Sequence, residues 1–543
     1  MRALQQFPSI GETRVARSKS AKAKGGDQGA EASGGARPGD ALRLNLLVLI
    51  SGAAFMSLEI AGSRLLAPHF GNSVFVWGSL ITVFLAALSL GYFVGGIVAD
   101  KHPSFLWLNG LLVLVAVLIG LIPWLAHPTC RMLVGMGLGE QTGPLAASLL
   151  LFLAPSVCMG MVSPFSVRLA ARDLSTMGRA AGTLYAVSTL GSILGTLLTT
   201  FALIPHFGVS SIVRGQSLVM FLLPLGMYLS LKASKAPMAV TVLLAATCLA
   251  LPSPPASGLR DGEVLVLDED TPYHNISVVE YQDRVRMLKF DRYTEGGITI
   301  EPPFRSIFHY TDYFHLAWLL KPDAQSALFI GAGGGIGPRT FHSMNPDMHV
   351  EVVDIDERVL EIAVEHFEMP ASLPTAAQDG RMFLFDQPRK YDIIVLDAFT
   401  IGGRIPFHLA TSEYFELCKQ HMSEDGVFVM NTNSSLAGEK GRIFSSIAST
   451  IHSVFPHVQA FPDSYARVRE KSAPRAIVFV ASNRKDTPSR EDWLALLPLY
   501  PGGSYLSRPD LRSMIGDLYE AMPDLSDVPP MTDELAPIET MAF

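Results

Sequence analysis

The sequence predicts an N-terminal polytopic α-helical membrane domain and a C-terminal doubly wound α/β domain, preceded by a small antiparallel β-sheet. Three observations predict this. Of the 543 residues, 49% are hydrophobic and only 17% are charged, and most of the apolar excess lies before residue 255. Long apolar runs recur between residues 41 and 252. After them, short apolar runs alternate with helix-like segments, which is typical of a mostly parallel sheet covered by helices.

Residues 1–40 contain few large apolar side chains and many Gly, Ala, Ser, Lys and Arg residues. This composition predicts a disordered segment, because it offers too little apolar surface to form a core. No short apolar core followed by a cleavage site is present in it, so we interpret it as a retained cytoplasmic tail and not as a signal peptide.

The transmembrane domain is expected to span 41–252 with about seven crossings, because each apolar run approaches the roughly 20 residues that a bilayer requires. The runs lie near 43–63, 75–98, 105–126, 144–163, 181–204, 212–231 and 236–252. The last run is the shortest. Basic residues gather in alternate loops, at Lys101, at Arg168, Arg172 and Arg179, and at Lys232 and Lys235. This alternation predicts that the N-terminus lies inside.

The segment Gly91–Lys101 resembles the cytoplasmic loop between the second and third helices of major-facilitator transporters. Seven crossings that begin inside would put the C-terminal domain outside, away from cytosolic nucleosides. Either segment 236–252 does not span, or an eighth crossing exists, or the domain faces the periplasm. Because nucleoside cofactors are supplied in the cytosol, we expect a multi-pass protein of the cell inner membrane with a cytoplasmic catalytic domain.

Two charged residues, Glu59 and Arg64, fall within or beside the first apolar run. Ionisable groups in a membrane are costly and are usually paired or functional. They could form an ion pair that fixes packing or could lie on a substrate path. Small residues at four-residue spacing, such as Gly91 with Gly95 and Gly191 with Gly195, predict close helix packing.

The remaining chain divides into four segments. Residues 253–260 form a linker rich in Pro and Ser, and 261–305 contain three short runs (264–267, 276–280 and 285–290) that predict the small β-sheet. Residues 306–485 form the α/β domain, and 486–543 form a C-terminal extension. Within the α/β domain we expect helices at 304–320, 338–344, 357–367 and 412–421 and strands at 327–330, 349–353, 391–396, 426–430 and 477–480.

A glycine-rich turn lies at the centre of the α/β domain. The apolar run 327–330 leads into Gly331, Gly333, Gly335 and Gly337, a helix-like segment follows, and the next apolar run ends on Asp354. Strand, glycine turn, helix, strand and terminal acid predict a Rossmann-like βαβ unit that binds a nucleoside. The glycines let the backbone approach the ligand, and the acid can bind both ribose hydroxyls.

Three acids follow apolar runs in this domain. Asp354 ends the second strand, Asp379 follows a weak apolar stretch that is a candidate third strand, and Asp397 ends the fourth. Ligands of such sheets bind outside the carboxyl ends of the strands. The acids and the glycine turn therefore outline a pocket for a ribose, an adenine amine and one reacting group. For any one of the acids, the alternative is a helix N-cap or a turn former.

Residues 264–485 resemble the spermidine synthase (polyamine aminopropyltransferase) family, and nearly the full chain resembles its membrane-fused bacterial subfamily. The motifs that carry the likeness are Thr271–Ile276, the glycine turn, Val353–Asp356, Gln378–Arg381, Tyr391–Phe399, Ile405–Thr411 and Met531–Pro537.

The resemblance implies a methyltransferase-type Rossmann-like fold and an aminopropyl donor, decarboxylated S-adenosylmethionine. Asp397 matches the catalytic acid of the family, which orients the acceptor amine and accepts its proton. The implied cofactor-binding residues are Gly331, Gly333, Gly335, Asp354, Asp379 and Gly380, with Asp354 on the ribose and Asp379 near the adenine amine. The implied substrate-binding residues are Tyr310, Asp312, Tyr273 and His274, and no metal is implied.

Three positions depart from the family pattern. Gly334 stands where the family has an acid that holds the free amine of the donor, and Thr400 stands where it has a second acid for the polyamine. Thr294 aligns loosely with a glutamine that contacts the donor. Loss of the acid at 334 would also remove repulsion toward the carboxylate of intact S-adenosylmethionine.

Three functions therefore stay open. The first, which we favour, is a membrane-anchored aminopropyltransferase acting on a polyamine acceptor such as putrescine. The second is a methyl or alkyl transferase that uses S-adenosylmethionine on a membrane-delivered acceptor. The third is a transporter-like protein that senses a nucleoside or polyamine.

The expected partners are a small-molecule amine and the lipid bilayer, and we allow for a homodimer. Nucleic acid is not expected, because the net charge is −8 and basic runs beside aromatic residues are lacking. The four cysteines have no metal-ligand spacing and predict neither a zinc site nor a disulfide framework.

Overall fold

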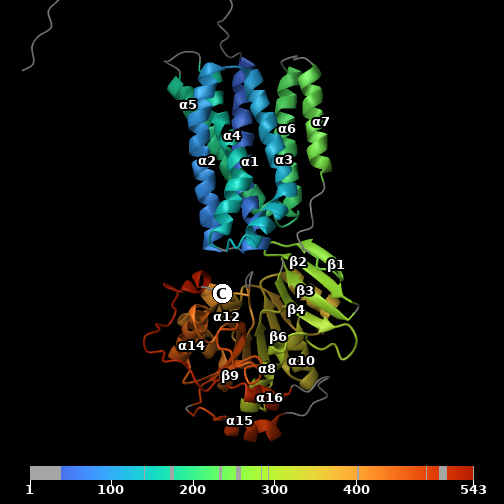
Figure 1. Ribbon diagram of the computed structural model, residues 1–543, viewed down its shortest axis with the longest axis vertical. Helices are drawn as coiled ribbons and strands as arrows, with labels where there is room; N and C mark the ends of the chain where they lie inside the picture. Colours follow the sequence, from blue (N-terminus) through green and yellow to red (C-terminus); the bar gives the residue numbers. More distant parts are fainter. Residues whose placement is uncertain are drawn as a thin grey trace, which may run out of the picture.

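The computed structural model shows a helical bundle, a small β-sheet and an α/β domain stacked along the longest axis of the molecule (Figure 1). It describes residues 38–541 except for 72, 140, 172–176, 231–234, 252–258, 283, 292, 400–402, 485 and 501–509. Residues 1–37 of the predicted tail at 1–40, most of the predicted linker and position 400 thus lie outside the described residues. Residues 38–40 of the predicted tail are the first residues of a helix.

Seven helices form the bundle. They are α1 (Pro38–Phe70), α2 (Val74–Lys101), α3 (Phe105–Gly135), α4 (Gly143–Ala170), α5 (Met177–Leu198), α6 (Val209–Ser230) and α7 (Lys235–Ala250), with a short π-helix (Thr199–Leu203) after α5. Six of the described helices are long and apolar enough to cross a membrane, and α7 is a shorter apolar helix. All of the predicted apolar segments are helical. Large apolar side chains cover the outside of the bundle, for example Phe93 and Phe201, which are 69% and 74% exposed.

Glycines allow the bundle helices to pack closely, as predicted. A Cβ on Gly91 would lie 2.4 Å from the Val157 carbonyl oxygen on α4, and a Cβ on Gly191 would lie 2.0 Å from the Leu49 carbonyl oxygen on α1. Any larger side chain would push these helix pairs apart. The interpretation of these residues as packing positions is confirmed.

Helix α1 runs toward the α/β domain, and its Arg64 leaves the bundle. The Arg64 guanidinium donates hydrogen bonds to the carbonyl oxygens of Thr271 and Tyr273, the second over 2.9 Å. An ion pair between Glu59 and Arg64 is therefore not how Arg64 is held. The alternative that Arg64 lies near a substrate path is taken up with the site.

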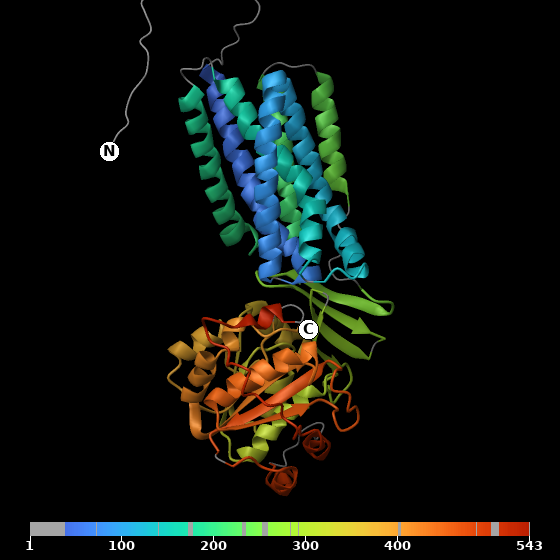
Figure 2. The ribbon, with the colours of Figure 1, turned by 60° about the vertical axis from the view of Figure 1, so that its left-hand side comes forward.

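The start of α1 and the α/β domain lie at opposite ends of the bundle (Figures 1 and 2). Helix α7 lies in the bundle beside α6 and ends short of the end of the bundle that faces the α/β domain (Figure 1). Segment 236–252 was the first candidate for a run that does not span, and it forms the 16-residue α7, which is shorter than each of the six candidate spans. A cytoplasmic N-terminus and a cytoplasmic catalytic domain therefore exclude each other if all seven helices cross.

The small sheet has four antiparallel strands in the order β1-β2-β3-β4: β1 (Glu263–Asp270), β2 (Asn275–Tyr281), β3 (Val285–Phe290) and β4 (Tyr293–Thr299). Three of them were predicted, and β4 was not. Its central Gly296 and Gly297 interrupt the apolar alternation that identifies strands. They are needed because a Cβ on Gly297 would lie 2.5 Å from Ile307, and one on Gly296 would lie 3.1 Å from the Gly334 nitrogen.

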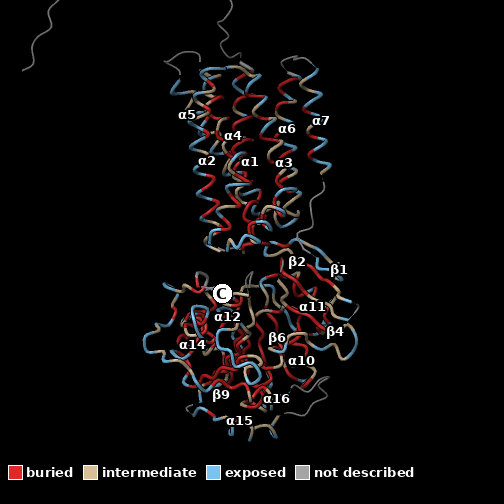
Figure 3. Tube along the Cα trace, viewed as in Figure 1, coloured by how far each residue is buried: buried red, intermediate tan, exposed pale blue. Residues whose placement is uncertain are grey.

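The α/β domain contains a seven-stranded sheet in the order β10-β11-β9-β8-β5-β6-β7. The strands are β5 (Ser326–Ile330), β6 (His349–Asp354), β7 (Thr375–Ala377), β8 (Tyr391–Leu396), β9 (Met422–Ser434), β10 (His457–Pro462) and β11 (Arg475–Ser482). Strand β11 pairs antiparallel with β9 and β10, and all other neighbouring strands pair in parallel. Phe329 and Val395 face one core while Leu328 and Ile394 face the other, so both faces of the sheet are buried (Figure 3).

Helices cover both faces. They are α8 (Tyr310–Tyr313), α9 (Ala317–Leu320), α10 (Ile336–Met344), α11 (Glu357–Phe367), α12 (Gly380–Asp386), α13 (Ser412–Gln420), α14 (Arg442–Val454), α15 (Arg490–Leu496) and α16 (Leu511–Gly516). The predicted fold class is confirmed. The predicted helix at 304–320 is wrong in detail, because the chain there forms α8, a 3₁₀ turn (Phe314–Leu316) and α9. Strand β10 and helix α14 were not predicted.

The predicted C-terminal extension packs back on the α/β domain. Asp533 forms an ion pair with Arg381 at 2.6 Å and accepts a hydrogen bond from Thr411. The Tyr519 backbone nitrogen donates to the Ala460 carbonyl oxygen on β10. These contacts attach the last residues to the helices near the carboxyl ends of the strands.

Candidate active site

A cavity of about 300 Å³ lies at the carboxyl ends of β5, β6 and β8, on the side of the α/β domain that faces the bundle. Its walls come from three parts of the chain: the α/β domain, the small sheet and the end of α1 with the turn that follows. The strand order puts Asp397, the glycine turn, Asp354 and Asp379 side by side. Ligands of doubly wound sheets bind at this position.

The glycine turn forms the floor of the cavity between β5 and α10. Gly331 has a φ of 95°, and a Cβ there would lie 2.4 Å from the Asp397 carbonyl oxygen. Only glycine therefore lets the ends of β5 and β8 meet. Gly333 and Gly334 also line the cavity, whereas Gly335 does not. Gly335 is the N-cap of α10 with a φ of 64°, and Met369 occupies the place of its Cβ.

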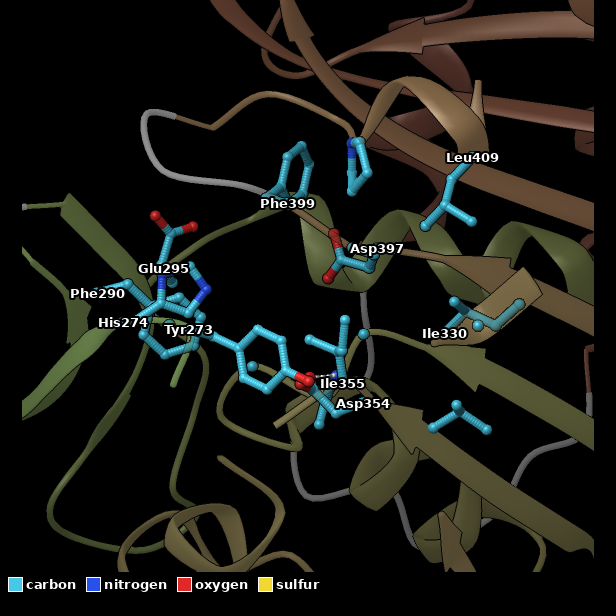
Figure 4. Close-up of a pocket in the computed structure, with 18 of the residues that line it drawn as sticks. Tyr273, His274, Phe290, Glu295, Ile330, Asp354, Ile355, Asp397, Phe399 and Leu409 are labelled. Carbon is cyan, nitrogen blue, oxygen red and sulfur yellow. Dashed lines mark hydrogen bonds between the residues drawn. The ribbon is translucent and has the colours of Figure 1, made fainter. Parts of the chain in front are cut away.

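Asp354 ends β6 and holds the glycine turn in place. Its Oδ2 accepts a hydrogen bond from the Ala332 nitrogen at 2.8 Å, and its Oδ1 accepts one from the Asp356 nitrogen at 3.0 Å. Burial raises the pKa of this carboxyl, and the two backbone donors oppose that rise. Asp354 lines the cavity and points toward it (Figure 4). Each oxygen retains a lone pair for a ligand hydroxyl.

Asp379 is the N-cap of α12. A capping role was the alternative to ligand binding that the sequence left open for each of the three acids. Its Oδ1 accepts hydrogen bonds from the nitrogens of Arg381 and Met382, and its Oδ2 lies 2.8 Å from His408 Nε2. The hydrogen bond with His408 lowers the pKa of Asp379. Asp379, Gly380 and His408 all line the cavity, so the capping role does not remove the acid from the site.

Asp397 follows β8 directly and lies at the centre of the cavity (Figure 4). Asn431 Nδ2, on the neighbouring strand β9, donates to its Oδ1 at 2.9 Å. The Tyr310 hydroxyl, on α8, donates to its Oδ2 at 3.4 Å. Burial raises the pKa of Asp397 to about 7, although both donors lower it. This carboxyl can therefore exchange a proton near neutral pH.

Tyr273 and His274 belong to the turn between β1 and β2 and form one side of the cavity. The His274 ring stacks on Phe290 at 4.6 Å, and the Tyr273 ring extends toward Asp354 (Figure 4). The Thr271 hydroxyl donates to Asp356, which joins this turn to the α/β domain. Asp312 does not line the cavity, although the neighbouring Tyr310 and Thr311 do.

The end of α1 and the turn that follows it close the side of the cavity that faces the helical bundle. Arg64, Phe70, Gly71 and Ser73 all line it. Because Arg64 also binds the carbonyl oxygens of Thr271 and Tyr273, α1 fixes the turn that carries Tyr273 and His274. The sequence marked Arg64 as a costly charge that could form an ion pair or lie on a substrate path, but nothing in the local pattern shows that it reaches another domain.

Glu295, on β4, is a cavity residue that the sequence reasoning missed. The loose alignment pointed to Thr294, which does not line the cavity, while its neighbour does. Burial, Asp397 and Asp291 raise the pKa of Glu295 to about 8. Recognition of β4 as a strand beside the glycine turn would have been the signal needed to find it.

Comparison with known proteins gives a consistent result. Residues 308–487 match the family model described as the spermine/spermidine synthase domain. The chain is 30% identical over 247 residues to a polyamine aminopropyltransferase of Vibrio vulnificus, covering 44% of this chain and 78% of that protein. It is 29% identical over 235 residues to a probable polyamine aminopropyl transferase of Bifidobacterium longum, covering 43% of this chain and about half (51%) of that protein.

A probable spermidine synthase from Corynebacterium glutamicum is similar to 50% of this chain over 96% of its own length, with 18% identity and a TM-score of 0.39. The sequence matches, together with the glycine turn and the acids at the sheet edge, identify the family. This chain belongs to the spermidine synthase, or polyamine aminopropyltransferase, family.

Proposed function

We propose that this protein is a membrane-anchored aminopropyltransferase. It transfers the aminopropyl group of decarboxylated S-adenosylmethionine to a polyamine acceptor such as putrescine and releases methylthioadenosine. The observation that carries the proposal is Asp397, a buried carboxyl with a pKa near 7 that lies beside a nucleoside-binding glycine turn. A nucleoside sensor has no need of a proton acceptor at this position.

The donor would lie over the glycine turn. Asp354 would accept hydrogen bonds from the ribose hydroxyls, and Asp379 with Gly380 would lie near the adenine amine. Tyr273 would lie on the acceptor side of the ribose. Support comes from the lining of the cavity by Asp354, Asp379 and Gly380 and from the free lone pairs of Asp354.

The reaction needs one bond made and one broken. The lone pair of the acceptor amine attacks the methylene carbon next to the sulfonium, the carbon–sulfur bond breaks, and the neutral thioether leaves. The nitrogen becomes positively charged as the carbon–nitrogen bond forms, and the Asp397 carboxylate accepts one of its protons. The sulfonium already activates the carbon, so most of the rate enhancement would come from holding the two reactants in line.

Two donors prepare Asp397 for this task. Asn431 and Tyr310 stabilise its ionised form, because both donate hydrogen bonds to it. Burial opposes them and keeps the pKa near the working range of a general base. Tyr310 would also border the acceptor, and Asp312 would act only from outside the cavity.

The anchor is the helical bundle, whose apolar surface fits a lipid bilayer. We propose the cell inner membrane with the α/β domain on the cytoplasmic side, because the donor is made in the cytosol. The basic loops favour the opposite orientation, since Lys101 and Arg168 lie at the far end of the bundle, where Arg168 pairs with Asp100. Reporter fusions at residue 541 and in the loop at 102–104 would decide: a periplasmic signal at 541 overturns the cytoplasmic proposal.

The function is tested by product identity. Purified full-length protein is incubated with decarboxylated or intact S-adenosylmethionine and a panel of amines, and the released nucleoside is identified by mass. Methylthioadenosine together with an extended polyamine is expected. S-adenosylhomocysteine would establish methyl transfer instead, and the absence of both products with every donor would contradict an enzymatic role. Size determination of the same sample tests the predicted homodimer.

A further inference from the structure

The structure assigns Glu295 as the residue that binds the terminal ammonium of the donor's aminopropyl chain and selects the decarboxylated donor over intact S-adenosylmethionine. This inference rests on the proposed function. It concerns the amine of the donor, which in the family is held by an acid at the position that Gly334 occupies in this chain.

The backbone turns Glu295 into the cavity. Strands β3 and β4 pair Leu288 with Gly296 and Lys289 with Thr294, so Glu295 is the extra residue of a β-bulge. Bulges re-aim side chains and are common next to active sites. Glu295 lines the cavity, where it lies across from Asp397 (Figure 4).

The bulge lies directly against the glycine turn. A Cβ on Gly296 would lie 3.1 Å from the Gly334 nitrogen, and a Cβ on Gly333 would lie 3.9 Å from the Glu295 carbonyl oxygen. A side chain at position 334 itself would press on the Phe367 ring, 3.3 Å from its Cβ. In this chain the acid therefore comes from β4 and not from the glycine turn.

Among the described residues, none donates a hydrogen bond to the Glu295 carboxylate or forms an ion pair with it. Its charged neighbours are two further acids, Asp397 and Asp291, and together with burial they raise its pKa to about 8. A desolvated carboxyl beside two acids favours a cation, and a primary ammonium in the cavity would provide one.

A bound ammonium favours the ionised form of Glu295, and the resulting negative charge acts against the intact donor. S-adenosylmethionine carries a carboxylate on the carbon that bears its ammonium, and this carboxylate would meet Glu295 and Asp397. The decarboxylated donor lacks it. Glu295 would thus restore the repulsion that the glycine at 334 removes, and the site would prefer the aminopropyl donor.

The test measures equilibrium binding of three nucleosides to the full-length protein by calorimetry. Decarboxylated S-adenosylmethionine carries the ammonium alone, S-adenosylmethionine carries ammonium and carboxylate, and methylthioadenosine carries neither. In Glu295→Gln, the Kd of the decarboxylated donor should rise about 10- to 100-fold, as expected for the loss of one charge-assisted hydrogen bond. Binding of methylthioadenosine should be unchanged, and discrimination against S-adenosylmethionine should narrow.

The matched control is Glu301→Gln, an exposed glutamate that follows β4 and does not line the cavity. It should bind all three nucleosides as the native protein does. Equal weakening of the decarboxylated donor and methylthioadenosine in Glu295→Gln would make Glu295 a structural residue and overturn the inference, as would unchanged binding of both. If the native protein binds neither decarboxylated S-adenosylmethionine nor methylthioadenosine, the proposed function itself fails.

Discussion

The two halves of the cavity differ in how the chain builds them. The donor half consists of the glycine turn, Asp354 and Asp379, which lie within one stretch of about 50 residues at adjacent strand ends. The opposite half, where the aminopropyl chain and the acceptor would lie, brings together Arg64 from helix α1, Tyr273 from a β-turn and Glu295 from a bulge. The donor half is therefore a local motif, whereas the other half exists only when three parts of the chain fold together.

This contrast explains why the membrane domain belongs to the site. A nucleoside can bind to the α/β domain through backbone groups of one βαβ unit. The space that we propose for the acceptor, however, is bordered by the end of α1 and by the turn at 271–274 that Arg64 fixes. Substitutions in the two halves should consequently affect different steps.

The largest effect on activity is expected for Asp397→Asn, because Asp397 lies where the two halves of the cavity meet. An amide cannot accept the amine proton, so kcat should fall by roughly 10²- to 10⁴-fold. The donor Kd should change little, because Asp397 does not hold the nucleoside. Steady-state kinetics and calorimetry measure the two quantities. Asp386→Asn, an exposed aspartate at the end of α12, should behave as the native protein. Retention of native kcat in Asp397→Asn would refute its role as base.

Asp354→Ala should weaken binding of the nucleoside by the donor half of the cavity and leave the opposite half intact. The substitution removes the ribose acceptor and both hydrogen bonds that hold the glycine turn. We expect the Kd of the donor and of methylthioadenosine to rise by roughly 10- to 100-fold, because hydrogen bonds to a charged group are lost. Asp347→Ala, in the exposed turn before β6, is the control. Unchanged nucleoside affinity would contradict the assignment of Asp354 to the ribose.

Arg64→Ala should weaken binding of the acceptor by the opposite half of the cavity and leave the donor half intact. Loss of its bonds to Thr271 and Tyr273 frees the turn that borders the acceptor, so the acceptor KM should rise by about tenfold, the cost of one charged hydrogen bond. The Kd of methylthioadenosine should stay near the native value. Arg43→Ala, at the opposite end of α1, removes an arginine that pairs only locally, with Asp40. Equal loss of nucleoside and acceptor affinity in Arg64→Ala would show that α1 supports the whole domain.

The smallest effect is a shift in pH dependence. The pKa of Asp397 lies at about 7, and only its ionised form accepts a proton, so kcat should rise with pH through about 7. Asn431→Leu removes a donor that lowers this pKa, and the rise should move to higher pH by up to about one unit. The profile of kcat against pH, with acceptor at saturation, measures it. A rise near pH 4, or one that Asn431→Leu leaves in place, would exclude Asp397 as the titrating group.

Most of the fold could be predicted because its signals are local. The spans, β5, β6 and β8 follow from continuous apolar runs, and helix α11 begins and ends at the predicted residues. Strand β4, which was missed, contains two glycines, and the aromatic segment around Tyr313 forms short helical turns instead of one helix. Strand β7, expected only as a candidate from a weak apolar stretch, has three residues.

The candidate site divides in the same way. Asp354, Asp379 and Asp397 could be placed at one edge, because parallel strands expose their carboxyl ends together. That Asp379 also caps a helix, that Asp312 lies outside the cavity and that Glu295 lies inside it could not be inferred. These facts depend on which side chains face each other across separate domains.

The sequence by itself determined the membrane bundle, the doubly wound sheet and the nucleoside motif, since apolar periodicity and glycine spacing act over a few neighbouring residues. Tertiary structure alone decided that α1 closes the cavity and that a bulge in β4 brings Glu295 into its lining. The physical reason is that both depend on contacts between residues far apart in the chain. Arg64 reaches residues more than 200 positions away, and such contacts leave no local pattern.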